Sequence, residues 1–470
     1  MRRFHKVIFS LNFLYILLIA AQVAAIIFLC LSAPAVLPLA AAYAGAWLLA
    51  FITAAVLLVR TGSPETKCAW FVVICGLPVA GAVIYLIATA RKRACGVLKL
   101  EASPATELGR CAYSYCGTSE AGYDEAAYFR TGAEFFKRMF AEIERAKESV
   151  YAEFFIVARG HVFNAFLQAI EKARANGAEV KILIDGIGSA FKLSKKDVNL
   201  IKAAGAEVRV FRRITPLPRA RLNFRDHRKI VTVDGKLAFT GGINLADEYA
   251  NIASPYGYWK DNGLVIYGGA AKIFEGMFLS MWYGRHEMRA PEGGNHSCLP
   301  YLDGPPRRGF CEEAYVHAIT SARERVHIMT PYFCVGERLH GALEWAARRG
   351  VDVKIIIPHI PDKPYAFELS KATAFTLKPS GVQFYEYTPG FMHAKAVICD
   401  DRVFLGSYNF DYRSMRLNFE CGVSFTGKLC DEVESDFAEC VALSSPMSEG
   451  KISPAKRFSR FVLKLFAPLV

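Results

Sequence analysis

The chain has 470 residues, of which 53% are hydrophobic and 21% are charged. This length exceeds one ordinary hydrophobic core, and the apolar content excludes a disordered chain and a small disulfide scaffold. The 57 Lys and Arg residues against 44 Asp and Glu give a formal net charge of +13, which favours a polyanionic partner, either nucleic acid or an anionic membrane.

The cysteines predict reduced, structural thiols. There are 13 of them, an odd number, with no C-x-x-C pair and no Cys/His spacing typical of a zinc site. Such a set is expected where the catalytic part of a protein faces the cytosol. We therefore predict neither a disulfide framework nor a bound metal.

Three apolar stretches lie near the amino terminus, over residues 7–31, 37–59 and 68–89. Each reaches the roughly 20 residues that cross a hydrocarbon core, and none contains a charged residue. A cleaved signal peptide accounts for one such stretch but not for three. Residues 1–95 are therefore predicted to be a multi-pass segment in the cell membrane.

The topology of this segment has two solutions. Basic residues precede the first stretch and follow the third, although three full crossings place these two ends on opposite sides of the membrane. Either the third stretch, with Gly76, Pro78 and Gly81 at its centre, is a re-entrant hairpin, or the amino terminus faces outward. In both cases the cluster Arg91 to Arg93 and the reduced cysteines predict a cytosolic catalytic domain.

After residue 95, amphipathic helical patterns alternate with short β-branched runs such as residues 180–184 and 353–357, which predicts a parallel or mixed sheet covered by helices. The region also repeats itself in order. AKESV at 146–150 is echoed by ARERV at 322–326, and NGAEVKI at 176–182 by RGVDVKI at 349–355. Two copies of one α/β fold are therefore predicted.

Each copy carries the motif H-x-K-x4-D, as HRKIVTVD and as HAKAVICD. In an extended strand, residues two apart share a face, so each His and Lys are predicted to point to the same side while the Asp lies at the following turn. The candidate catalytic residues are His227, Lys229, Asp234, His393, Lys395 and Asp400.

Small residues and an amide follow each motif. Gly241, Gly242 and Asn244 follow the first, and Gly406, Ser407 and Asn409 follow the second. Small residues let a backbone approach a ligand closely, and an amide side chain can donate to an oxyanion. Asn244 and Asn409 are therefore predicted to contact substrate.

Two histidines and two lysines that meet at the interface of two repeats suit phosphodiester chemistry without a metal or another cofactor. One imidazole attacks phosphorus and holds the phosphoryl group, while the other protonates the leaving alkoxide and later deprotonates the acceptor. The lysines offset charge on the non-bridging oxygens. An Asp at the far ring nitrogen of an imidazole would fix its tautomer.

The last residues of the chain predict an amphipathic basic helix on the membrane surface. Its apolar positions follow helical spacing, its basic positions lie on another face, and Pro468 ends it. A helix packed on the domain's own core is the alternative. The apolar positions are Phe458, Phe461, Val462, Leu465 and Phe466, and the basic ones are Arg457, Arg460 and Lys464.

At these motifs the chain resembles the phospholipase D superfamily and, within it, the bacterial cardiolipin synthases. The resemblance rests on the twin motifs, on RDHRK with TGGIN, on YWKDNG and YTPGFMHAK, and on GSYNFDYRSMRLNFECGV. The last string contains Asn409, Arg413, Asn418 and Glu420, and the resemblance implies that Glu420 contacts substrate. The chain departs from the synthase pattern at Ser370, Lys371, Ala372 and Phe375, which follow IPDK.

The resemblance implies an architecture and a reaction. Two phospholipase D-like α/β/α sandwich domains, over residues 96–290 and 291–445, follow the transmembrane segment 1–95 and precede a basic amphipathic tail, 446–470. The implied reaction passes a phosphatidyl group from one phosphatidylglycerol to a histidine, His227 by resemblance, and then to a second phosphatidylglycerol, giving cardiolipin and glycerol. His393 is the implied acid and base, and anionic membrane lipid is the implied partner.

Three alternatives remain. A phospholipase D-like hydrolase or another phosphatidyltransferase can resolve the same phosphohistidine with water or with another alcohol. A nuclease would need a basic groove with stacking aromatics, and the apolar stretches disfavour nucleic acid as a partner. A catalytically silent membrane scaffold conflicts with the complete set of motif residues.

Overall fold

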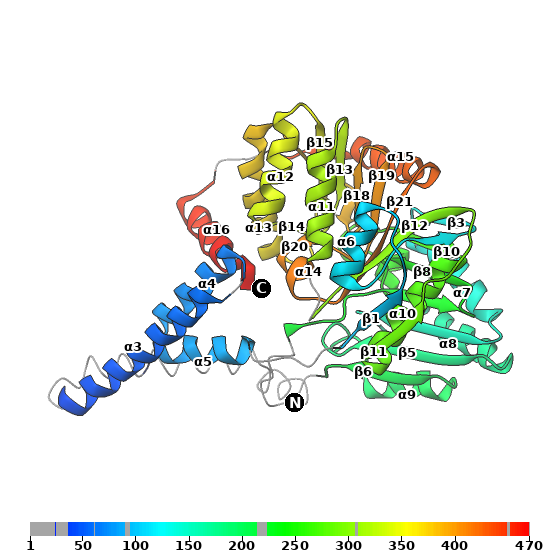
Figure 1. Ribbon diagram of the computed structural model, residues 1–470, viewed down its shortest axis with the longest axis horizontal. Coiled ribbons are helices and arrows are strands. Elements are labelled where there is room, and N and C mark those ends of the chain that lie inside the picture. The colour runs from blue at the N-terminus through cyan, green and yellow to red at the C-terminus, as the bar shows by residue number, and fades with distance from the viewer. Residues whose placement is uncertain are drawn as a thin grey trace. The chain divides into compact units, whose positions relative to one another are not determined.

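The computed structural model describes residues 24, 36–60, 62–89, 95–213, 223–305, 309–448 and 452–469. The chain divides into two compact units, one of residues 1–93, 212–223 and 461–470 and the other of residues 94–211 and 224–460 (Figure 1). The first predicted apolar stretch, apart from Ala24, and the cluster Arg91 to Arg93 lie outside the described residues.

The smaller unit contains the helices α3 (Val36–Val59), α4 (Pro64–Gly76) and α5 (Pro78–Thr89), each in contact with the other two. α3 coincides with the second apolar stretch, whereas the third stretch bends at Leu77 and becomes two helices. Gly81 lets α5 approach α4, because a Cβ there would lie 2.2 Å from the carbonyl oxygen of Val73. Within this unit the short helix η4 (Ala467–Leu469) contacts α4.

Among the helices whose side chains are described, none is long and apolar enough to cross a membrane.

The larger unit contains the two predicted repeats, each built on a mixed sheet. In the first, β4, β5 and β6 are parallel and the remaining neighbours are antiparallel. In the described residues this sheet has seven strands, in the order β3 (Ala126–Phe129), β10 (Gly263–Tyr267), β8 (Leu237–Gly241), β7 (Ile230–Val233), β4 (Ser149–Phe154), β5 (Glu179–Asp185) and β6 (Glu207–Phe211).

The second sheet repeats this pattern, with β13, β15 and β16 parallel. Its described strands follow the order β2 (Ala121–Tyr123), β12 (His296–Asp303), β21 (Glu420–Thr426), β19 (Arg402–Gly406), β18 (Ala396–Cys399), β13 (Arg325–Met329), β15 (Asp352–Pro358), β16 (Gln383–Tyr387) and β22 (Ser444–Pro446). Six consecutive strands of each sheet correspond in order and direction, which confirms the internal repeat. β2, from the first half of the chain, completes the edge of the second sheet.

Helices cover both faces of each sheet, as predicted for an α/β/α sandwich. In the first repeat, Val231 and Val265 pack with α7 and α8, whereas the alternate residues Ile230 and Leu264 pack with α10. Around this sheet lie α7 (Gly132–Glu144), α8 (His161–Ala175), α9 (Lys195–Ala203) and α10 (Gly269–Tyr283).

In the second repeat, Phe437 of α15 stacks on His327 of β13, and Tyr315 of α11 packs on Phe404 of β19. The strand register puts His327 and Phe404 on opposite faces, so α11 and α15 cover opposite sides of the sheet (Figure 1). The helices of this half are α6 (Glu107–Cys116), α11 (Phe310–Ser321), α12 (Glu337–Arg348), α13 (Pro364–Leu377), α14 (Tyr412–Arg416) and α15 (Lys428–Ala442). The helix α16 (Pro454–Phe466) begins in the larger unit and ends in the smaller one.

Short parallel ladders complete the larger unit. β9 (Tyr258–Lys260) of the first repeat pairs with β17 (Gly390–Met392) of the second, directly ahead of His393. β1 (Val97–Glu101) pairs with β11 (Arg285–Arg289), and β14 (Phe333–Cys334) pairs with β20 (Phe410–Asp411). The cysteines among the described residues are free thiols.

Candidate active site

The two motifs occupy equivalent places in the two repeats. His227 and Lys229 directly precede β7, and His393 and Lys395 directly precede β18, in extended segments rather than inside a strand as predicted. All four side chains are buried. The predicted proximity of His and Lys is confirmed in the second motif, where Lys395 Nζ lies 3.0 Å from Nδ1 and 3.2 Å from Nε2 of His393.

Backbone hydrogen bonds join each histidine to the other repeat. The N–H of His227 donates to the carbonyl of Phe419 at 2.9 Å, and the N–H of His393 donates to the carbonyl of Lys260 at 2.7 Å. Phe419 and Lys260 are the residues directly before two buried carboxylates. The pairing therefore brings a carboxylate of one repeat to the imidazole of the other.

Each imidazole binds that carboxylate through Nδ1. His227 Nδ1 lies 2.9 Å from Glu420 Oε2, and His393 Nδ1 lies 2.6 Å from Asp261 Oδ2. A carboxylate at Nδ1 favours the tautomer with the proton on that nitrogen. Nε2 then carries the lone pair, which is the arrangement required for attack on phosphorus or for accepting a proton.

Both imidazoles are neutral in this environment. Burial, with the charges of the nearby lysines, lowers the pKa of His227 to about 4 and that of His393 to about 3, against the attraction of their carboxylates. Burial alone would raise the pKa of Asp261 and of Glu420, but the adjacent histidine and lysine hold both below their ordinary values. The two carboxylates are therefore charged.

The two motif lysines have lowered pKa values. Burial lowers the pKa of Lys229 to about 8 and that of Lys395 to about 7. Lys395 also lowers the pKa of His227, and Lys229 that of His393, so the two motifs share one electrostatic environment. A phosphodiester bound here would favour the charged form of both lysines, which could then offset its negative charge.

The motif aspartates do not contact the imidazoles, which corrects that expectation. Asp234 accepts hydrogen bonds from the backbone N–H groups of Lys147, Glu148 and Ser149 at 2.7 to 3.1 Å. Its φ of 53° is the left-handed conformation that a tight turn demands. The carboxylate thus anchors the turn before β8 to the start of β4.

Asp400 does the same in the second repeat. It accepts from the N–H groups of Arg323, Glu324 and Arg325 at 2.9 to 3.1 Å, and its φ is 51°. AKESV and ARERV, the first matched pair of the repeat, are therefore the backbone partners of the two motif aspartates. Both aspartates belong to the scaffold beneath the site.

Glu420 was expected at the substrate, but it is the partner of an imidazole. Besides His227, its carboxylate accepts from Ser414 Oγ at 2.8 Å, from Asn418 Nδ2 at 3.1 Å and from Ser407 Oγ. These donors leave Glu420 little capacity for a ligand, and it is completely buried. Its neighbours hold it against His227.

The two asparagines differ in their surroundings. Asn244 donates through Nδ2 to Tyr249 Oη at 2.7 Å and accepts through Oδ1 from the N–H of Ile156 at 3.0 Å, so both of its polar atoms already bind protein. Asn409 donates its backbone N–H to Ser414 Oγ at 3.1 Å. Contact of either side chain with substrate stays a prediction.

Asp261 was missed as a site residue. It precedes Gly263 by two residues, just as Glu420 precedes Gly422, and these glycines pair with Gly241 and Gly406 at equivalent places in the two sheets. The signal was therefore an acid-x-Gly pattern in YWKDNG and NFECGV, one in each repeat. Spacing from the histidines could not reveal it, because the partners belong to different repeats.

Aromatic rings surround the second histidine. The rings of Tyr249, Trp259 and Phe391 lie 5.1 to 5.8 Å from that of His393, centroid to centroid, whereas Phe155 lies 5.0 Å from His227. Such walls exclude water and strengthen the electrostatic interactions among the charged groups. Within the described residues, no group of His, Cys, Asp and Glu is arranged to hold a metal ion.

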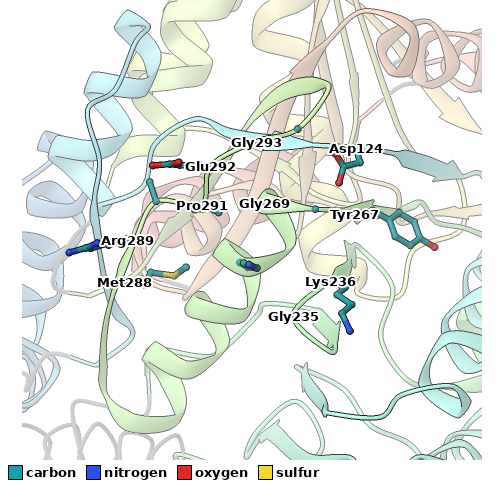
Figure 2. A pocket seen from close by; sticks show the side chains of 14 residues that line it. Asp124, Gly235, Lys236, Tyr267, Gly269, Met288, Arg289, Pro291, Glu292 and Gly293 are labelled. Carbon is teal, nitrogen blue, oxygen red and sulfur yellow. The ribbon is translucent and has the colours of Figure 1, made fainter.

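A cavity of about 740 Å³ lies away from this chemistry (Figure 2). It borders the turn that contains Gly235 and Lys236 and the start of α10, and neither motif histidine lines it. Its charges are mixed, with Lys236, Lys272 and Arg289 opposed by Asp124 and Glu292. We assign no role to this cavity.

Known proteins resemble this chain in sequence and in fold. The family model "Cardiolipin synthase, PLD-like domain" matches residues 139–282 and 315–441, which together contain both motifs. The chain belongs to this cardiolipin synthase family. A second model, "Phospholipase_D-nuclease N-terminal", matches residues 45–88.

Relatives of this cardiolipin synthase family member cover most of its length. A cardiolipin synthase of Geobacillus thermodenitrificans is 32% identical over 67% of this chain and 66% of its own length. An uncharacterized protein of Streptococcus mutans is 36% identical over 74% of this chain and 78% of its own length. The crystal structure of a phosphatidylserine synthase of Haemophilus influenzae superposes with a TM-score of 0.58, at 15% identity, over 77% of this chain and 98% of that one, which shows a shared fold.

Proposed function

We propose that this member of the cardiolipin synthase family transfers a phosphatidyl group between two molecules of phosphatidylglycerol through a phosphohistidine. The observation that carries the proposal is the exchange of carboxylates between repeats. Each imidazole binds a carboxylate through Nδ1 and so presents Nε2 to a substrate, beside two buried lysines. Its curated relatives named cardiolipin synthase support the assignment.

In the first step, Nε2 of His227 attacks the phosphorus of one phosphatidylglycerol. The P–N bond forms, the bond from phosphorus to the headgroup glycerol oxygen breaks, and His393 gives its proton to that oxygen, so free glycerol leaves. The anionic phosphodiester favours the protonated form of the acid, because a nearby negative charge raises the pKa of an imidazole. Glu420 stabilises the positive charge that His227 acquires.

In the second step, His393 takes the proton from the terminal hydroxyl of a second phosphatidylglycerol. The oxygen of that hydroxyl attacks phosphorus, the P–N bond breaks, and cardiolipin forms with His227 free again. Lys229 and Lys395 offset charge on the non-bridging oxygens throughout, with Asn244 and Asn409 as further candidate donors. The chain's own side chains suffice for this cycle without another cofactor.

The enzyme is proposed to act at the cell membrane with its catalytic unit on the cytosolic side. The apolar stretches before residue 95 support this location, as does the match of residues 45–88 to a family model of an amino-terminal segment. The net charge of +13 suits a surface of anionic lipid.

The test is product analysis with the purified full chain in vesicles that contain phosphatidylglycerol labelled in its headgroup glycerol. Cardiolipin and free labelled glycerol in equal amounts are expected. Phosphatidic acid in place of cardiolipin would assign the chain as a hydrolase, and no product from folded protein would overturn the proposal. H227A is the matched inactive control.

A further inference from the structure

The first half of α16 is held on α13 by ion pairs. Lys456 Nζ lies 3.0 Å from Glu368 Oε1, and Arg460 Nε lies 3.2 Å from Glu368 Oε2. The guanidinium of Arg460 also lies 5.7 Å from the centre of the Phe375 ring, and this side chain is only 11% exposed. Burial alone would raise the pKa of Glu368, but Lys456 and Arg460 hold it below its ordinary value.

This contact determines which face of the first half of α16 is exposed. Lys456 and Arg460, four residues apart, share the face toward Glu368, whereas Phe458 and Phe461, three apart, share another. Phe458 is 69% exposed and Phe461 is 64% exposed. The other members of the predicted apolar face, Val462, Leu465 and Phe466, are partly buried.

The exposed face combines apolar and basic side chains. Arg457 and Lys464 are also exposed, and residues 452–469 contain no Asp or Glu. Exposed aromatic rings with cations and without acids complement a surface that is apolar beneath a negative layer. An anionic lipid bilayer has that chemistry.

We propose that α16 is a membrane-contact helix whose Phe458 and Phe461 enter an anionic lipid surface, while Glu368 fixes the orientation of the helix. The proposal rests on the proposed lipid substrate and deepens it, because it assigns the contact by which the catalytic unit meets that substrate.

The helix α13, which pairs with α16, also contacts residues next to the candidate active site. Ser370 Oγ accepts from the N–H of Phe333 at 2.9 Å, and Asp362, just before α13, accepts from Tyr332 Oη at 2.6 Å. The ring of Tyr332 packs at 6.4 Å on that of Phe391, part of the aromatic wall around the second histidine. Because α16 is paired with α13, a bilayer that binds α16 is connected through α13 to this aromatic wall.

The same helix carries the departure from the synthase pattern. Phe375 receives Arg460, Ser370 supports the strand after Tyr332, and Lys371 Nζ pairs with Glu386 Oε1 at 2.8 Å. We infer that this segment of the chain serves to hold the tail and the site wall together.

The test places a fluorescent non-natural amino acid at position 458 or 461 of the full chain, in vesicles of phosphatidylglycerol with brominated acyl chains. Position 345, whose Trp is 56% exposed on α12, is the matched control. Quenching by bromine is expected at 458 and 461 and not at 345. Replacing Arg457 and Lys464 by Gln should lower the affinity of the chain for these vesicles, measured from the quenching, by roughly fivefold for each cation removed.

The variant E368Q tests the orienting role. It is expected to release Lys456 and Arg460, so that trypsin cleaves the tail severalfold faster and quenching at 458 falls, whereas E344Q, which breaks an ion pair within α12, changes neither. Equal cleavage of E368Q and wild type would overturn this role.

The outcomes separate the inference from the proposed function. Cardiolipin formation without quenching at 458 and 461 overturns the membrane contact alone. Quenching without any lipid product overturns the proposed function alone. Cross-links from position 458 to a second copy, without quenching, would make the face an interface between two copies and would also overturn the inference.

Discussion

The two repeats share a fold but hold their histidines differently. Glu420, the partner of the first histidine, is fixed by two hydroxyls and an amide besides His227. Asp261, the partner of His393, has instead the backbone N–H of Asn262 at 2.9 Å. The duplicated scaffold therefore holds its two imidazoles in unequal settings, which suits the proposed division into one nucleophile and one acid.

The two motif lysines also differ in how they contact the histidines. Both lysines donate to the backbone carbonyl of the histidine in their own motif, and Lys395 Nζ in addition lies 3.0 Å from Nδ1 and 3.2 Å from Nε2 of the His393 ring. Burial is the largest cause that lowers the pKa of each imidazole, and Lys395 is the next cause for His393, since a cation beside a ring opposes its protonation. The negative charge of a bound phosphodiester would raise the pKa of both imidazoles.

The largest expected effect separates the two histidines. H227A and H393A should both lose turnover, but H393A should still form the phosphohistidine from a phosphatidyl ester of an activated phenol, because that leaving group needs no proton. H227A should form none. The measurement is covalent lipid on each variant, with folded protein and active wild type as controls.

Covalent lipid on H227A but not on H393A would make His393 the nucleophile and His227 the acid and base. Label on neither variant would contradict the division of labour between the repeats.

The next effect concerns the exchanged carboxylates. E420Q and D261N are each expected to lower kcat by about 10² to 10⁴ with little change in KM, because an amide neither fixes the tautomer nor stabilises the charged imidazole. E420Q should also lower the melting temperature more, since it disturbs three further donors. S414A, which removes one hydrogen bond to Glu420, is the control, and rates equal to wild type in E420Q would contradict the pairing.

The sequence allowed prediction of the mixed sheets and of each pair of His and Lys, because these follow from residues close together in the chain, and of the repeat, because its matched strings keep their order. The bend between α4 and α5 was equally local, at Gly76 and Pro78. The partners of the imidazoles were not predictable in this way. Glu420 lies almost two hundred residues after His227, and only the association of the two repeats brings them together.

The motif aspartates show a second limit. Their repetition with each His and Lys suggested shared chemistry, yet Asp234 and Asp400 are repeated because each copy needs the same turn. A spacing that recurs in both copies of a repeat is thus evidence for equivalent structure, and a catalytic role needs the further observation that a side chain reaches the site.

A smaller effect, on stability alone, is expected from these aspartates. D234G and D400G keep the positive φ but remove a carboxylate that accepts three backbone N–H groups, so each should lower the free energy of unfolding by about 1 to 3 kcal/mol while kcat stays near that of wild type. Denaturant melts and initial rates measure both quantities. D401A, a change at an exposed neighbour, is the control. A loss of kcat without a loss of stability would mean that the two aspartates take part in the reaction.

The smallest effect is the pH dependence of stability. The pKa of His227 is about 4 in the folded protein against an ordinary 6.5. Between these values the unfolded chain binds more protons, so stability falls as the pH drops from 6.5 toward 4. His393, with a pKa of about 3, continues the loss to lower pH. H227Q and H393Q, whose amides still donate to the carboxylates, should therefore each flatten the fall in apparent melting temperature by roughly 1 to 4 °C, with H393Q flattening it further toward acid. Curves parallel to wild type would mean that the two imidazoles are not held neutral by burial.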